Sequence, residues 1–122
     1  FLSEKELKNE LGKIIIDEEV IAKTAGLAVM ECYGLVGMSS RSVQDGLADL
    51  LGWDNISKGV GIDISEDKVH LDLNIIVEYG TNIHEVAHNV MERVRYTLEN
   101  KVGIEVVTID VNVRGVRVGD AN

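Results

Sequence analysis

Residues 84–88 read His-Glu-Val-Ala-His, the spacing by which two histidines on one helix hold zinc in metalloproteases. In that chemistry the intervening acid, here Glu85, activates a metal-bound water. A catalytic zinc also needs a third protein ligand, and none follows at the spacing typical of these enzymes. Arg95 falls on the same side of the helix, where its charge disfavours a metal. We therefore interpret His84 and His88 as solvent-facing helix residues, and a zinc-dependent hydrolase stays an alternative.

A second motif, Gly34-Leu35-Val36-Gly37, fits the GxxG loop by which K-homology domains hold RNA. Those loops present their backbone to phosphates and usually have basic neighbours, whereas Glu31 and Cys32 precede this one. The formal net charge of −9 also opposes binding to a phosphate backbone. An RNA-binding module is therefore kept only as a second alternative.

Other reactive residues lack visible partners in the sequence. The single Cys32 has no second cysteine to pair with and follows apolar helix positions, which favours a small core side chain over a nucleophile. His70 is predicted to lie opposite Asp63, a pair that could support acid–base chemistry or half a metal site, but is more often a surface contact. We predict no catalytic residue, no cofactor and no enzymatic activity.

Length and composition favour one domain with an aliphatic core. The chain has 122 residues, of which 45% are hydrophobic and only 4% aromatic. Its acidity repels nucleic acid and anionic lipid head groups. A single cysteine and the lack of a long apolar run predict a cytoplasmic protein without direct membrane insertion.

Hydrophobic periodicity predicts an α+β domain over residues 12–118, in the order β-α-(β)-α-β-β-α-β. Residues 1–11 are expected to be a tail or short helix, and 119–122 a C-terminal tail. The expected strands are 14–16, 34–38, 59–65, 68–79 and 104–114. The expected helices are 18–32, capped by Asp17, then 43–51 and 83–101, the last begun by Asn82 and Glu85 and ended by Gly103.

The clearest local signal is a hairpin over residues 59–79, in which apolar and polar residues alternate on both sides of a turn. Its register places three apolar pairs on one face, Val60 with Leu73, Ile62 with Leu71, and Ile64 with Val69. The last strand alternates in the same way, with Val107, Ile109, Val111 and Val113 on its dry face and a bulge at Gly115. These patterns predict a two-layer sandwich, with a mixed sheet covered by helices on one face and a parallel crossover into the last strand.

The polar face of this sheet is the candidate interaction surface, because nothing is predicted to cover it. It carries the side chains of Asp63, His70, Asp72, Asn74, Asp110 and Asn112. Trp53 is a second candidate, since an isolated tryptophan in a loop is often an interface anchor; a lid over the core is the other interpretation. We expect protein partners, including a second copy of the chain or an envelope-linked membrane protein.

Several segments, in this order and spacing, resemble the bacterial alkaline-shock family, a general-stress and envelope-stress family. They are Gly12-Lys13-Ile14, Val20–Gly26, Gly34–Met38, Lys58-Gly59-Val60, Ile75–Gly80, Glu85-Val86-Ala87 and Gly103–Val107. The resemblance implies a cytoplasmic protein linked to envelope or alkaline stress, without known catalytic activity, some members of which lie near the membrane through partners. Members typically have other residues at positions 84 and 88, and the family offers no catalytic residues to carry over.

Overall fold

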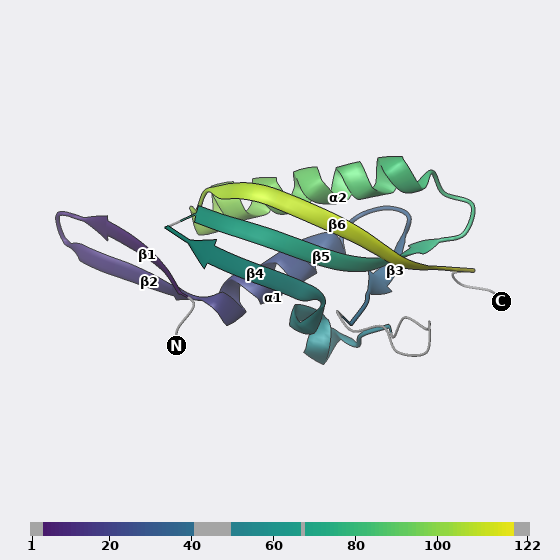
Figure 1. Cartoon of the computed structure of the whole chain (residues 1–122), viewed down its shortest axis with the longest axis horizontal. Coiled ribbons are helices and arrows are strands. Elements are labelled where there is room, and N and C mark those ends of the chain that lie inside the picture. The colour runs from purple at the N-terminus through teal and green to yellow at the C-terminus, as the bar shows by residue number, and fades with distance from the viewer. Residues whose placement is uncertain (1–3, 41–49, 67, 119–122) are drawn as a thin grey trace.

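Helices cover one face of a four-stranded mixed sheet in the computed structural model of the chain (Figure 1). The structure describes residues 4–40, 50–66 and 68–118. The elements are β1 (Glu4–Asn9), β2 (Gly12–Asp17), α1 (Glu18–Val29), β3 (Leu35–Met38), the 3-10 helix η1 (Trp53–Gly59), β4 (Val60–Ser65), β5 (Lys68–Glu78), α2 (Ile83–Thr97), the π-helical turn η2 (Leu98–Val102) and β6 (Val106–Arg117). The predicted α+β sandwich is confirmed.

Strand β5 is the centre of the sheet, because it is paired along both of its edges. The parallel strand β6 follows residues 69–78 on one edge. On the other edge, β4 pairs antiparallel with residues 68–73 and β3 pairs antiparallel with residues 75–77. Strands β3 and β4 therefore lie end to end along the same side of β5. This arrangement confirms both the mixed sheet and the parallel crossover through α2.

The β4–β5 hairpin has the predicted register. Val60 faces Leu73, Ile62 faces Leu71, and Ile64 faces Val69. A slip by one residue would turn each of these side chains to the other face of the sheet, and the helices would then have no apolar surface to cover.

An aliphatic core fills the space between the sheet and the two helices. The fully buried residues of β5 on this side are Val69, Leu73, Ile75 and Val77, with Leu71 nearly so. The helices contribute Ile21, Ala22, Ala25, Ala28, Val29, Val86, Val90, Val94 and Leu98. The predicted helical stripes are thus largely confirmed, whereas Val20 and Ile83 in the first helical turns are about half exposed.

The last strand carries two irregularities that change which side chains face the core. Between Val106 and Thr108 the register with β5 shifts, so Val106 points inward and Val107, predicted on the dry face, is 41% exposed. A second shift precedes Gly115 and leaves Arg114 without a partner residue on β5. This confirms a bulge at the predicted place, and a bulge re-aims the side chain it displaces.

Two of the three predicted helix-end signals act as expected, and the third is at the predicted position without its hydrogen bond. The Asn82 side chain accepts a hydrogen bond from the Glu85 backbone N–H at 3.0 Å and caps α2. Gly103 ends η2 in the left-handed conformation, with φ of 90°. Asp17 stands at the N-cap of α1 as predicted, but its side chain makes no capping hydrogen bond.

The N-terminal segment differs from its prediction. Residues 4–9 form strand β1, which pairs antiparallel with β2 as a separate two-stranded sheet, rather than a helix or tail. The leucines at helical spacing misled the prediction, because pairing of Glu4–Asn9 with the β-branched run of β2 decides the conformation. The predicted helix 43–51 and the C-terminal tail lie wholly or almost wholly outside the described residues.

Gly34 lies where the end of α1, β3 and the start of α2 meet. Its φ is +82°, and an added Cβ would lie 2.7 Å from Cγ2 of Val86. Its carbonyl accepts a hydrogen bond from the backbone N–H of Glu78 at 2.9 Å, which ties this junction to β5.

We expect Gly34→Ala to lower the free energy of unfolding by about 2 kcal/mol, because left-handed backbone strain adds to the clash with Val86. Urea denaturation followed by circular dichroism measures this change. Gly52→Ala is the control, since Gly52 has open space around its Cα, and should shift stability by less than about 1 kcal/mol. Equal stability of the two variants would contradict the role assigned to Gly34.

Candidate functional site

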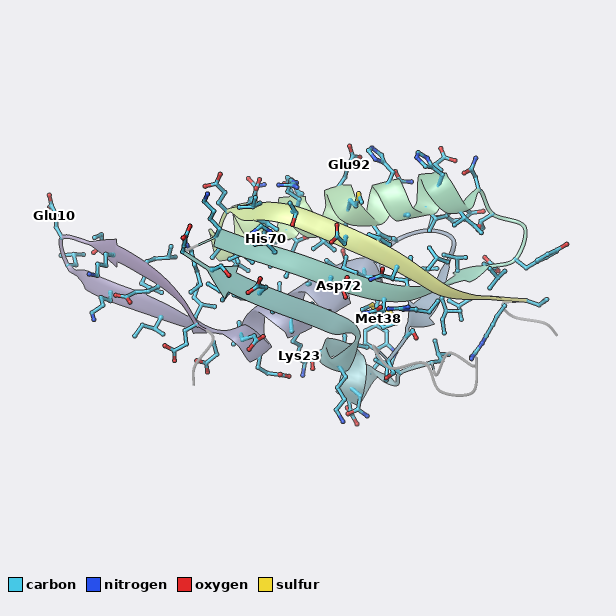
Figure 2. The ribbon with its side chains drawn as sticks, viewed as in Figure 1. Glu10, Lys23, Met38, His70, Asp72 and Glu92 are labelled. Carbon is cyan, nitrogen blue, oxygen red and sulfur yellow. The ribbon has the colours of Figure 1, made fainter. Side chains whose placement is uncertain are left out.

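The face of the main sheet opposite the helices, called here the outer face, carries charged side chains from three strands. Asp63 comes from β4, His70 and Asp72 from β5, and Asp110 from β6. These four residues line an open depression of about 380 Å³. Figure 2 shows His70 and Asp72 on the side of β5 that is turned away from the helices. The structure thus brings together four of the six residues predicted for this surface.

His70 and Asp63 are cross-strand neighbours as predicted, but they do not form an acid–base pair. The His70 ring nitrogen Nδ1 lies 2.7 Å from the hydroxyl of Thr108 on β6. The Asp63 carboxylate instead accepts a hydrogen bond from the Ser65 hydroxyl at 3.1 Å. Each side chain is therefore held by a neutral hydroxyl, and the arrangement is that of a structured polar surface.

Asp72 is oriented by Asn112 of β6, which lies two residues beyond Asp110, the residue that directly faces Asp72. The Asn112 amide donates to the Asp72 carboxylate at 2.6 Å and to the Leu73 carbonyl at 3.3 Å. Asn112 is half-buried, so its role is to position Asp72 more than to meet a partner directly. Asp63 and Asp110 are the exposed carboxylates of the depression.

Asn74 is not a surface residue, which corrects its place in the predicted interaction surface. Its side chain is fully buried. The amide donates to the Gly59 carbonyl at 3.0 Å and accepts from Nε of Arg114 at 2.8 Å. Asn74 stands on β5 between the residues that pair with β4 and those that pair with β3, so it fills the junction between these two strands.

Trp53 begins η1 with its side chain 63% exposed. The lid over the core is instead supplied by Ile56 of the same 3-10 helix, which is 1% exposed and packs against Gly26 of α1. This placement favours the interface interpretation of Trp53 over the lid. Trp53 is not among the residues that line the outer-face depression.

The two histidines of the His-Glu-x-x-His motif lie on the exposed side of α2. His88 pairs with Glu92 one turn further on at 3.2 Å, and Figure 2 shows Glu92 pointing away from the sheet. Arg95 reaches the Val106 carbonyl. Among the residues that the structure describes, no three His, Cys, Asp or Glu side chains are grouped to hold a metal ion. A catalytic zinc site needs such a third ligand, so this geometry does not support the hydrolase alternative.

The Gly34–Gly37 motif is not a phosphate-binding loop. Residues 35–38 form strand β3, whose backbone pairs with β5. A Cβ on Gly37 would lie 2.6 Å from Leu50, and Gly34 faces Val86. Both glycines thus lie against neighbouring side chains, and this placement does not support the RNA-binding alternative.

Sequence reasoning missed an open groove of about 480 Å³ between the end of α1 and the outside of α2. It is lined by Glu31, Cys32, Tyr33, Asn89, Glu92, Arg93 and Tyr96. Arg93 and Glu31 form an ion pair across it at 2.9 Å. The two sides of the groove are about sixty residues apart in the chain, so no local pattern could have revealed it.

Cys32 is half-buried at this groove, and its thiol donates to the Ala28 carbonyl at 3.7 Å. Burial raises the pKa of the Cys32 thiol; the positive charge of Arg93 opposes this shift and Glu31 adds to it. The thiolate is the reactive form of cysteine, so a raised pKa makes Cys32 a poorer nucleophile. This agrees with the structural role predicted for Cys32.

Comparison with known proteins places the chain in a family. The model of an alkaline-shock protein family, described as having a "cell envelope-related function", matches residues 6–118. The chain belongs to this alkaline-shock protein family. The membership confirms the resemblance seen in the sequence, and the match includes the β1–β2 hairpin from Glu6 onward as well as the sheet and helices.

Relatives of this alkaline-shock-family protein cover most of its length. The uncharacterized protein YloU of Bacillus subtilis is 46% identical over 93% of this chain and 95% of its own. The uncharacterized protein Spy1614 of Streptococcus pyogenes serotype M6 is 33% identical over 91% and 93%. A stress response regulator gls24 homolog of S. pyogenes serotype M3 is 24% identical over 84% of this chain and 57% of its own. No solved structure matches the chain.

None of the helices in the described part of this alkaline-shock-family protein has the length and hydropathy needed to cross a bilayer.

We expect Asn74→Ala to lower the free energy of unfolding by about 2 kcal/mol, because the buried Gly59 carbonyl and Arg114 would lose their partner. Thermal and urea unfolding measure the change. The matched control is Asn100→Ala, since the exposed Asn100 of η2 donates to the Tyr96 carbonyl one turn earlier, at the end of α2; it should change stability by less than about 0.5 kcal/mol. If the Asn74→Ala protein is as stable as this control, Asn74 does not stabilise the junction between β3 and β4.

We expect the pH profile of Cys32 alkylation by iodoacetamide to have its midpoint at higher pH in the folded protein than in urea. Only the thiolate reacts, and burial raises the pKa of this thiol in the folded state. Reduced access would lower the rate at every pH but would not move the midpoint. A folded midpoint at or below the unfolded one would show that burial does not control this thiol.

Proposed function

We propose that this alkaline-shock-family protein is a non-enzymatic interaction module of the envelope stress response, which binds a protein partner through the outer face of its sheet. The observation that carries the proposal is that helices seal one face of the sheet while the other holds an open, charged depression on three strands. The link to stress draws on the relatives that are named stress response regulators.

The outer face favours a partner with basic side chains. Asp63, Asp72 and Asp110 contribute three carboxylates to one depression, and the whole chain has a formal net charge of −9. Complementary charge increases the rate of encounter and excludes partners of like sign. Because these side chains stand on paired strands, they are preorganised, and little conformational entropy is lost on binding.

The groove between α1 and α2 is larger but is less suited to recognising a charged partner. Its central charges, Arg93 and Glu31, already neutralise each other. On the outer face, by contrast, the exposed carboxylates of Asp63 and Asp110 face solvent. We therefore assign the partner to the sheet.

The partner we propose is a cytoplasmic, Lys- or Arg-bearing segment of an envelope-linked membrane protein. Such a partner would hold the protein at the membrane periphery and requires no membrane-spanning helix in this chain. Protein binding rather than catalysis is supported by the hydroxyl-bonded His70 and by Cys32, whose thiol pKa is raised by burial.

We expect Asp63→Lys combined with Asp110→Lys to reduce the partner recovered by cross-linking and pull-down at least about tenfold, because charges of like sign at an interface cost several kcal/mol and each 1.4 kcal/mol is a factor of about ten. The protein is captured from soluble and membrane fractions, and the bound proteins are quantified by mass spectrometry. The envelope-linked partner is expected in the membrane fraction.

The matched control combines Glu92→Lys with Glu105→Lys, two exposed positions away from the depression with the same change in net charge. This control should capture as much partner as the unmodified chain. Equal recovery by both double variants, at equal thermal stability, would refute binding through the outer face.

A further inference from the structure

The β1–β2 hairpin projects from the main sheet and exposes apolar side chains (Figure 1). Leu11 is 97% exposed, Ile14 54% and Ile15 52%. Among the apolar side chains of the described hairpin, Leu7 and Ile16 pack against the core, and Lys5 is buried as well. A two-stranded hairpin is marginally stable by itself, and three or more strands are usually needed for a stable sheet. The hairpin therefore has the properties of an incomplete sheet.

One edge of this hairpin is suited to accept another strand. Strand β2 pairs with β1 along one edge, and in the described part of the chain no strand pairs with its other edge. The edge contains the β-branched run Ile14–Ile16 and no proline, which are the properties of a strand that pairs readily with another.

The sequence of β2 is complementary to itself when two copies run antiparallel. Residues 13–17 read Lys-Ile-Ile-Ile-Asp. If a two-fold axis passes beside Ile15, this residue faces its own copy and Ile14 faces Ile16 of the second copy. Lys13 then faces Asp17 at both ends. Each strand thus provides the opposite charge and the matching apolar surface that the other requires.

Neighbouring registers lose this match. Residues that face each other must have their N–H and C=O groups on the same edge, so the neighbouring registers have the two-fold axis at Ile14 or at Ile16. With the axis at Ile14, Lys13 faces Ile15; with the axis at Ile16, Asp17 faces Ile15 and Ile14 meets Glu18 of α1. Strand β1 is also less suited, because the register that pairs Glu6 with Lys8 sets Glu4 opposite Glu10. The charges therefore select one edge and one register.

We propose that two copies of the chain pair antiparallel along β2 about a two-fold axis at Ile15, to form the four-stranded sheet β1–β2–β2–β1. This inference goes beyond the function proposed above, since it concerns a different surface and a different partner. Dimerisation is tested with purified protein alone. Its outcome is therefore independent of whether the outer face captures a partner.

The first test is disulfide cross-linking in a Cys32→Ala background. Directly opposed residues of antiparallel strands have Cα atoms about 4.5–5.5 Å apart, within reach of a disulfide. We expect Ile15→Cys to form a covalent dimer under mild oxidation at least about tenfold faster than Leu11→Cys, although Leu11 is more exposed. Faster or equal cross-linking through position 11 would overturn the proposed register.

The second test exchanges the charges. Lys13→Glu alone and Asp17→Lys alone each place like charges opposite one another in their own dimer, and we expect the dimer dissociation constant to rise about tenfold in each. In an equimolar mixture of the two variants every facing pair is again opposite in sign. Sedimentation velocity and native mass spectrometry should show that the mixture regains the dimer as a heterodimer.

Lys8→Glu is the matched control, because Lys8 and Lys13 both contact Glu6, at 4.0 and 3.6 Å, but Lys8 is on β1. This variant should dimerise like the unmodified chain, which separates the loss of the contact with Glu6 from the loss of pairing across β2. Circular dichroism verifies that each variant is folded. The proposal is overturned if the unmodified chain stays monomeric up to millimolar concentration, or if the mixture of variants remains as monomeric as its components.

Discussion

The structure depends on the backbone pairing of β5 along both edges. With β6 on one side and with β4 and β3 in line on the other, this strand leaves few backbone groups without partners. A strand buried in this way needs apolar side chains toward the helices, and Val69, Leu71, Leu73, Ile75 and Val77 provide them. Both helices are attached to this surface, so the register of β5 positions α1 and α2 as well as the outer face.

Where β3 and β4 meet along one edge of β5, the side chain of Asn74 supplies hydrogen bonds at the interruption in strand pairing. Where one strand ends and the next begins, the ladder is interrupted, and a side chain has to supply hydrogen bonds there. The Asn74 amide donates to the Gly59 carbonyl, and the bulge in β6 brings Arg114 to the other end of the same amide. A polar residue on the outer face is therefore used for folding and is not available to a partner.

The chain separates its two proposed contacts in space. The outer face presents carboxylates held on a rigid sheet, whereas the hairpin presents an apolar edge on an arm that extends from the body, with Glu10 near its far end in Figure 2. Pairing through β2 would present two outer faces together, and linked sites raise the effective concentration of the second binding event.

The sequence by itself determined the elements whose patterns are local. Alternation specified the β4–β5 register, helical spacing specified the buried sides of α1 and α2, and Asn82 and Gly103 marked the ends of the last helical segment. Only the tertiary structure decided that residues 4–9 are a strand, that Asn74 is buried, and that Val107 is exposed. Each of these depends on a partner distant in the chain or on a shift in pairing, and alternation along one strand carries no information about what covers its face.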